Sequence, residues 1–287
     1  MIRVVYAQVV AQPRLWTLSD RTRKEPAVSM GAAQQHVVPK SVLERAFAVL
    51  DCFTADKQEL TLAELASRTG IPKSTVHRLT RLLVERRLLK RTATGFSVGI
   101  GLFEIGELAP DVRALRDASL PSLEELFEQT HETIHLGVLD GHEVLYFVKI
   151  VGYRAFPLPT RTGGRWPVHA CALGKALLAF DTPNFQHGLL SDLKPLTPYT
   201  ITNPRRLSQQ LTRARVEGVA YDDQEAVLGN ACVAAPIFGP TGHPAAAVSV
   251  AGPPHRLRAA QRAPIVRRAA TLITARIGGQ LPDGAAD

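Results

Sequence analysis

The side chains with the clearest binding chemistry lie within nine residues of one another. They are cationic or hydroxyl-bearing: Lys73, Ser74, Thr75, His77, Arg78 and Arg81. Val76, Leu79 and Leu83 recur among them at helical spacing, so a helix would bury these three and leave the polar set outside. Hydroxyls near a helix N-terminus bind phosphate, and arginine reads guanine in the major groove. The pattern predicts a DNA recognition helix, with an ordinary solvated amphipathic helix as the alternative.

Two further helices are expected before this one. Apolar residues at helical period predict the first over Ser41–Phe53, and Thr61 with Glu64 forms a capping-box signature for the second. Gly70 can end the second helix in the left-handed conformation, and Pro72 suits the start of the next. A tight turn should therefore join the second and third helices.

A basic hairpin is predicted after the recognition helix. Residues 86–91 and 96–98 are expected to form strands around a turn at 92–95, with Lys90 and Arg91 on the first strand. Three helices and a hairpin make a winged helix-turn-helix. In that geometry the third helix enters the major groove and the hairpin contacts phosphate beside it.

The charge of the chain supports this assignment. The net charge of +8 lies entirely in residues 1–98, which carry 16 basic and 8 acidic side chains, whereas residues 99–287 carry 18 of each. A basic N-terminal part followed by a neutral C-terminal part is typical of a phosphate-binding module joined to a sensing or assembly module.

Several stretches together resemble the IclR-type bacterial transcriptional regulators over residues 40–280. They are Val42–Ala46 with Val49–Leu50, Leu62–Ala66, Pro72–Leu79, His169–Ala179 and Asp222–Pro236. The resemblance implies an α+β protein with a winged helix-turn-helix at 40–98, a linker helix at 99–118 and an α/β, GAF-like effector-binding domain at 119–280. It also implies double-stranded DNA as a partner, a repressor rather than an activator, and a homodimer or dimer of dimers on a palindromic operator.

The remaining segments lead to simpler expectations. Residues 1–39 lack periodicity, which predicts a disordered extension; a basic arm along DNA and translation from Met30 are the alternatives. No segment reads as a membrane span, and a cytoplasmic location is expected. Cys52, Cys171 and Cys232 are odd in number and far apart, so they are expected to be reduced thiols.

The linker is predicted to be unusually apolar. Ile100 to Leu115 presents an apolar helical stretch interrupted at Pro110, and a partner subunit is expected to cover it. Ser119 and Pro121 are expected to start a separate helix that ends near Gln129.

His131-Glu132-Thr133-Ile134-His135 matches the zinc-hydrolase pattern H-E-x-x-H. That pattern needs a helix, whereas Leu136–Leu139, Asp140–Gly141 and Val144–Val148 predict a strand, a two-residue turn and a strand. Side chains four apart on a strand lie about 13 Å apart, too far to share one metal ion. No metal site and no cofactor are therefore expected.

The rest of the second domain should alternate helices and strands. Helices are expected at Ala172–Phe180, from Asn203–Pro204 to Gly218, and at about 257–277, with strands at 219–221, 232–238 and 245–251.

An effector site in this domain follows mainly from the resemblance. Gly163 and Gly164 match the loop that cradles the effector, and their amides could hold an anion. Asp222, Cys232 and Ser249 match pocket side chains, and His169 is expected to contact the ligand. Members that bind small oxo-acids have a second strand hydroxyl where this chain has Ala251, so the same ligand is not implied. The expected effector is a small carboxylic acid.

Two other functions stay open. Cys171 with His169 could form a nucleophile and base, but the sequence identifies no acid to orient them, so no catalytic residue is expected. A DNA-binding regulator with no effector is the other alternative.

Overall fold

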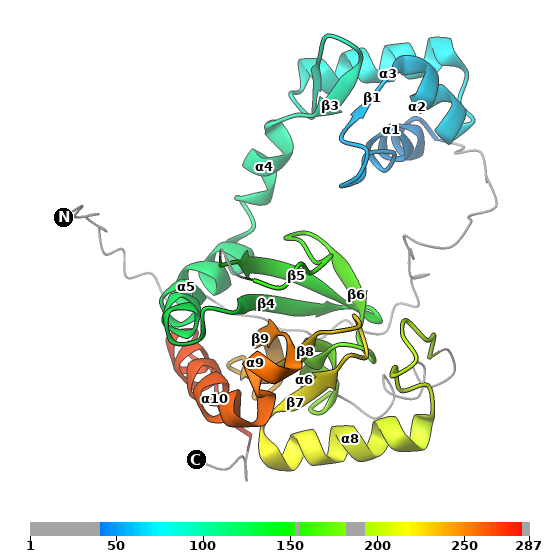
Figure 1. Ribbon diagram of the computed structural model, residues 1–287. Coiled ribbons are helices and arrows are strands. Elements are labelled where there is room, and N and C mark those ends of the chain that lie inside the picture. The colour runs from blue at the N-terminus through cyan, green and yellow to red at the C-terminus, as the bar shows by residue number, and fades with distance from the viewer. Residues whose placement is uncertain (1–40, 153–154, 182–192, 283–287) are drawn as a thin grey trace. The chain divides into compact units, whose positions relative to one another are not determined.

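The computed structural model describes residues 41–152, 155–181 and 193–282, which form two compact units divided after Arg113 (Figure 1). The expectations for residues 1–39, including the start at Met30, lie outside the described residues. None of the helices in the described ranges combines the length and apolar character needed to cross a membrane.

The first unit is a winged helix-turn-helix, as predicted. Its elements are α1 (Val42–Leu50), β1 (Glu59–Leu60), α2 (Leu62–Thr69), α3 (Lys73–Glu85), β2 (Leu89–Arg91), β3 (Phe96–Val98) and α4 (Gly101–Gly106). The predicted capping box of Thr61 and Glu64 is present, and Ser41 forms a second one with Glu44. Gly70 ends α2 at φ 66°, in the left-handed conformation that glycine accepts without strain.

The wing differs from the prediction in two respects. The two-residue strand β1 adds a third strand to the hairpin, in the order β1-β3-β2. A strand this short has no readable period, so the sequence did not indicate it. The first hairpin strand starts at Leu89 and not at Arg86, because the chain turns at Arg87, whose φ is 61°.

The region predicted as a linker and a separate helix contains one long helix. After α4, α5 runs continuously from Pro110 to Thr130 with Pro121 in its interior, so the predicted helix start at Ser119 is wrong. Proline normally interrupts a helix because it lacks the amide hydrogen. Here Leu123 and Leu126, buried against the sheet beyond Pro121, stabilise the continuous helix.

The second unit is built on a six-stranded antiparallel sheet in the order β6-β5-β4-β9-β8-β7. Its strands are β4 (Thr133–Asp140), β5 (Glu143–Ile150), β6 (Arg165–Pro167), β7 (Ala220–Asp223), β8 (Ala231–Phe238) and β9 (Pro244–Gly252). The predicted hairpin is present, but its turn is Gly141–His142, one residue later than predicted. β6 was not predicted because three residues carry no pattern.

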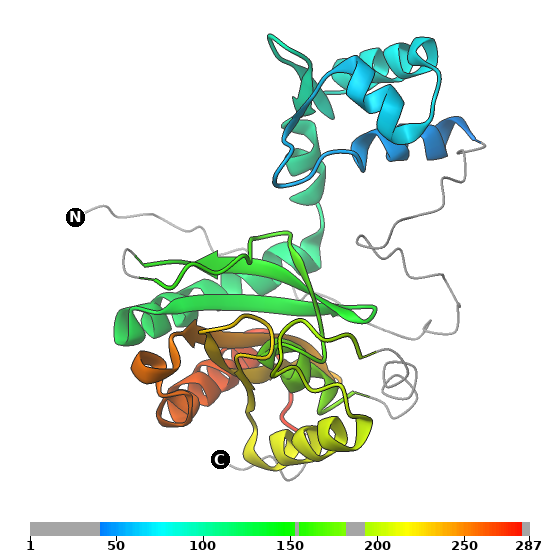
Figure 2. The same ribbon diagram turned by 45° about the vertical axis from the view of Figure 1, so that its right-hand side comes forward.

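Helices cover both faces of this sheet (Figures 1 and 2). α5 and α10 (Ala259–Arg276) pack on one face, while α6 (Ala172–Leu178) and then α8 (Pro204–Glu217) pack on the other. The last helix, predicted over about 257–277, is α10. A short helix that was not predicted, α9 (Pro254–Leu257), precedes it, and Arg258 at φ 48° separates the two.

The close approach of α6 to the preceding loop gives a first test. A Cβ on Gly174 would overlap the carbonyl oxygen of Val168, whereas a Cβ on Gly106 of α4 would meet nothing within 4 Å. Gly174→Ala should lower the melting temperature of the second unit by several degrees, and Gly106→Ala should leave it unchanged. Calorimetry of both variants checks this; equal melting profiles would contradict the packing described for α6.

Candidate DNA-binding surface and effector cavity

The predicted polar face of α3 lies on the surface of the first unit. Val76, Leu79 and Leu83 are buried in its core. Of the polar set, Thr75 is half-buried and the others are exposed: Lys73, Ser74, His77, Arg78 and Arg81. Thr80 faces inward and donates to the carbonyl of His77. The exposed face of α3 is therefore a continuous strip of donors.

The wing carries Lys90 and Arg91, both exposed on β2. The Arg91 guanidinium lies 5.6 Å from the centre of the Phe96 ring. Glu59 of β1 accepts hydrogen bonds from Thr92, at 2.6 Å, and from Thr94. These two hydroxyls lower the pKa of Glu59, so the carboxylate ties the wing tip to the sheet. No local pattern in the sequence indicates this contact, because Glu59 lies more than thirty residues from its partners.

The second unit contains a cavity between the sheet, α6 and the loop that joins β7 to β8. The space is about 340 Å³, including its open mouth. Ring-bearing and polar groups make part of its wall: His135, Tyr146, Thr160, Trp166, Cys171, Asp222, Asn230 and Cys232. The remainder is apolar: Leu158, Ala172, Leu173, Ala226, Val227 and Ala251. This composition is typical of a small-molecule site.

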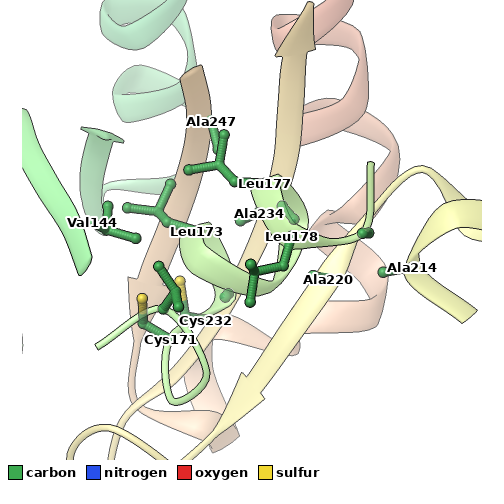
Figure 3. Close-up of a cluster of buried hydrophobic side chains, with 14 of the residues drawn as sticks. Val144, Cys171, Leu173, Leu177, Leu178, Ala214, Ala220, Cys232, Ala234 and Ala247 are labelled. Carbon is green, nitrogen blue, oxygen red and sulfur yellow. The ribbon is translucent and has the colours of Figure 1, made fainter. Parts of the chain in front are cut away.

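Two of the six predicted effector residues, Asp222 and Cys232, line this cavity. Figure 3 shows Cys232 with Cys171 at one end of the buried apolar cluster formed around α6. Burial raises the pKa of the Cys232 thiol well above its usual value, and the nearby carboxyl group of Asp222 adds to this rise. Ser249 lies fully buried on β9 opposite His135, behind the wall.

The other three predicted residues support the cavity from outside its wall. The Gly163 amide donates to the carbonyl of Tyr146, and the Gly164 amide donates to that of Arg161. Neither amide is therefore available to an anion in this conformation, which differs from the role that the sequence suggested. His169 is buried with its Nε2 2.9 Å from the carbonyl oxygen of Lys194.

A buried ion pair organises the β7–β8 loop. Lys175 Nζ lies 2.6 Å from Glu225 Oε1 and 2.8 Å from Gln210 Oε1. The side chains of Lys175 and Glu225 are only 1% and 6% exposed. Thr197 and Thr200 donate to main-chain carbonyls of the same loop, Thr200 to that of Glu225 at 2.6 Å. The loop that supplies Ala226, Val227 and Asn230 to the wall is thus fixed at several points.

The ionisable groups of the wall have shifted pKa values. Burial raises the pKa of Asp222 to about 7, with Glu225 adding to the rise and Lys175 opposing it. Burial, with the nearby Lys149 cation, lowers the pKa of His135 to about 3. The His135 ring is therefore neutral at physiological pH, and its Nε2 lies 2.9 Å from the Thr160 hydroxyl.

The Cys171–His169 arrangement does not support the enzymatic alternative. Burial raises the pKa of Cys171 to about 12, which disfavours the reactive thiolate. The H-E-x-x-H motif passes from the end of α5 into β4, as predicted, with His131 at φ 54° between them. Among the described residues, no group of three or more His, Cys, Asp or Glu is placed to hold a metal ion.

Sequence reasoning missed several wall residues. His135 drew attention only as part of a zinc motif, although its side chain faces the cavity. Tyr146 occupies an alternating strand position, which signals a sheet face without showing what covers it. Thr160, Trp166 and Asn230 come from loops and short strands that carry no periodic signal.

Comparison with known proteins agrees with the two-unit architecture. The model of the IclR helix-turn-helix domain matches residues 42–93, and that of the bacterial transcriptional regulator IclR C-terminal domain matches residues 109–275. The chain therefore belongs to the IclR family of DNA-binding transcriptional regulators.

Individual relatives match over most of their length. The chain is 30% identical over 265 residues to the transcriptional repressor IclR of Escherichia coli strain K12, covering 89% of this chain and 96% of the relative. It is 34% identical over 211 residues to the transcriptional regulator KipR of Bacillus subtilis strain 168, covering 72% and 84%. A crystal structure of an IclR homolog from Microbacterium hydrocarbonoxydans, complexed with 4-hydroxybenzoate, matches with a TM-score of 0.78 and 30% identity over 83% of this chain and 99% of that one.

The buried ion pair provides a second test. Lys175→Met leaves Glu225 buried without its cation, so it should lower the free energy of unfolding by about 3–5 kcal/mol. The double variant Lys175→Met, Glu225→Gln should recover a large part of this loss. Arg213→Met, which breaks an exposed pair with Glu217, is the control and should cost less than about 1 kcal/mol. Equal effects of Lys175→Met and Arg213→Met in chemical denaturation would contradict the role given to the buried pair.

Proposed function

We propose that this regulator binds a palindromic operator through α3 and the wing, and that a small molecule in the cavity of the second unit changes its DNA affinity. The observation that carries the proposal is the pairing, in one chain, of an exposed strip of donors on α3 with a cavity walled by rings and polar groups. Residues 1–98, which carry the net positive charge, supply affinity for phosphate, and the cavity of the second unit supplies selectivity for a ligand.

The DNA contacts in this proposal divide into two sets. Arg78 and Arg81 are placed in the major groove, and Ser74, Thr75 and Lys73 bind phosphate near the N-terminus of α3. His77 extends the same exposed face. Lys90 and Arg91 bind phosphate beside the groove, with the wing held by Glu59.

The effector proposed is a small carboxylic acid, preferably one with a ring. Tyr146, Trp166 and His135 supply flat surfaces in the wall. The related structure with 4-hydroxybenzoate supports a ligand of this size. Asp222 and Cys232 contact the ligand directly, whereas Gly163, Gly164, His169 and Ser249 hold the wall residues in place.

We propose a homodimer, or a dimer of dimers, and unburied apolar side chains in the first unit support it. On α1, Val42, Leu43 and Phe47 are 54–66% exposed, and four more follow β3: Ile100, Phe103, Ile105 and Leu108. A second copy that covers these residues would pair two recognition helices on a palindrome. We further propose repression as the mode of regulation, since relatives are named as repressors, and the cytoplasm as the location, where a bacterial chromosome lies.

The recognition surface is tested by single substitutions on α3. Arg78→Ala and Arg81→Ala should each weaken binding to a promoter fragment by about 1–3 kcal/mol, because each removes a contact to a base edge or phosphate. Arg268→Ala, an exposed arginine on α10, is the matched control and should change little. Fluorescence anisotropy measures all three; if only the control weakened binding, the recognition surface would lie elsewhere.

Assembly is tested through the exposed apolar residues. Light scattering of the wild type at micromolar concentration should give at least twice the 31.2 kDa chain mass. Phe103→Glu, at a side chain that is 61% exposed, should lower the mass because it places a charge in the apolar interface. Val216→Glu, at a 73% exposed residue of α8, should leave the mass unchanged. A monomeric wild type would refute the proposed dimer.

A further inference from the structure

The wall of the cavity poses an electrostatic problem for an anionic ligand. Among the described residues that line it there is no lysine or arginine, and the one histidine is neutral. Lys175 is close enough to influence Asp222, but its ammonium group is already bonded to Glu225 and Gln210. A bound carboxylate would therefore meet no free cation and would lie beside the carboxyl group of Asp222.

Asp222 can itself bind a carboxylate if it is protonated, because its two oxygens have different surroundings. Oδ1 accepts hydrogen bonds from the backbone amides of Glu225, at 2.7 Å, and Ala226, at 3.3 Å. Oδ2 has no hydrogen-bond partner in the part of the chain that the structure describes. A proton on this carboxyl group would therefore reside on Oδ2, where it is free to be donated to a ligand.

We propose that Asp222 binds the effector carboxylate as a neutral acid, donating its proton from Oδ2, so that effector binding to the ionised form takes up one proton from solvent. This inference rests on the proposed function of the cavity. The charges balance as follows. An ionised Asp222 combines with one proton and one anionic ligand, and the product is a hydrogen-bonded acid–carboxylate pair with a single negative charge. Such charge-assisted O–H···O⁻ bonds are short and strong.

Of the two neighbouring carboxyl groups, Glu225 bonds directly to the Lys175 ammonium group, whereas Asp222 bonds to backbone amides. Cys232 faces it from β8, Cys171 from the start of α6 and Tyr146 from β5, and burial raises the pKa of each of these far above neutrality. Burial raises the pKa of Glu225 on the loop, and its ion pair with Lys175 of α6 opposes this rise and favours the charged carboxylate. The pKa of Asp222, about 7, therefore sets the pH at which the binding-competent acid form is lost.

The sign of the pH effect follows directly. Below pH 7 Asp222 is mostly protonated and the cavity accepts a carboxylate; above it, the competent fraction falls tenfold for each pH unit. The dissociation constant of a carboxylate should thus rise about tenfold per unit between pH 7.5 and 9. A neutral ligand of the same shape needs no proton and should bind equally across this range.

The experiment uses isothermal titration of the full-length protein with matched probes, benzoate and benzamide, followed by 4-hydroxybenzoate and pyruvate, between pH 6 and pH 9. The expected result is that at least one carboxylate binds at pH 6 and weakens about tenfold per unit above pH 7.5, while amide binding is constant. Asp222→Asn keeps a donor at this position without an ionisable group, so its carboxylate binding should be retained and independent of pH. Asp223→Asn, at the exposed neighbour on β7, should behave as the wild type.

Several outcomes would overturn the inference. One is a wild-type affinity for the carboxylate that does not change with pH. Another is a carboxylate affinity that still depends on pH in Asp222→Asn. Binding of the amide with no carboxylate bound at pH 6 would also refute it, while leaving the cavity as a ligand site. Binding of none of the four probes at any pH would overturn both the inference and the carboxylic acid effector, and the DNA-binding assignment would stand on its separate anisotropy test.

Discussion

The buried pair of Lys175 and Glu225 is the interaction on which the cavity of the second unit depends. Removing two charges from water costs several kcal/mol per ion, and the cost is offset only by close, well-oriented contacts. Here Glu225 at 2.6 Å and Gln210 at 2.8 Å satisfy the ammonium group, and they come from a loop and from α8. One lysine of α6 therefore holds together the loop, the helix and the sheet edge that enclose the cavity. Asp222 lies at the base of that loop, within the field of both charges.

The N-terminal and C-terminal parts of the chain differ in how their charged side chains are arranged. Residues 1–98 carry the net positive charge of the protein, and the cations of α3 and the wing are exposed, so phosphate groups can replace their counterions. Residues 99–287 are neutral overall, and the charged or titratable groups buried around the cavity are ion-paired or have a shifted pKa. Ligand control of DNA binding then requires only that the ligand favour one arrangement of the assembled heads, a coupling of typically 1–3 kcal/mol.

Local signals in the sequence were sufficient for much of the fold. Three signals predict the helix-turn-helix, and each acts within a few residues. They are the capping box of Thr61 and Glu64, the left-handed conformation of Gly70, and the helical period of Val76, Leu79 and Leu83. Errors arose where tertiary packing outweighed local preference. Pro121 lies inside α5 because apolar residues beyond it are buried against the sheet.

The cavity was less predictable for the same physical reason. Asp222 and Cys232 were found through family resemblance, whereas His135, Tyr146 and Trp166 come together only when β4, β5 and β6 pair in register. The glycines at 163 and 164 looked like an anion-binding loop. Their amides instead complete backbone hydrogen bonds, which a sequence cannot show. Contacts between residues far apart in the chain, such as Lys175 with Glu225, carry no local signature.

The most direct test of the account is the DNA affinity of the protein with its cavity occupied and empty. The affinity of the protein for a labelled promoter fragment would be measured by fluorescence anisotropy, with and without a saturating concentration of a carboxylate that binds the cavity. The wild type would be compared with Val227→Trp, in which a larger side chain at a half-buried position of the wall fills the cavity. The account predicts that the compound changes the wild-type dissociation constant by about 5- to 150-fold and that of the variant hardly at all. Equal wild-type affinity with the cavity occupied and empty would contradict it.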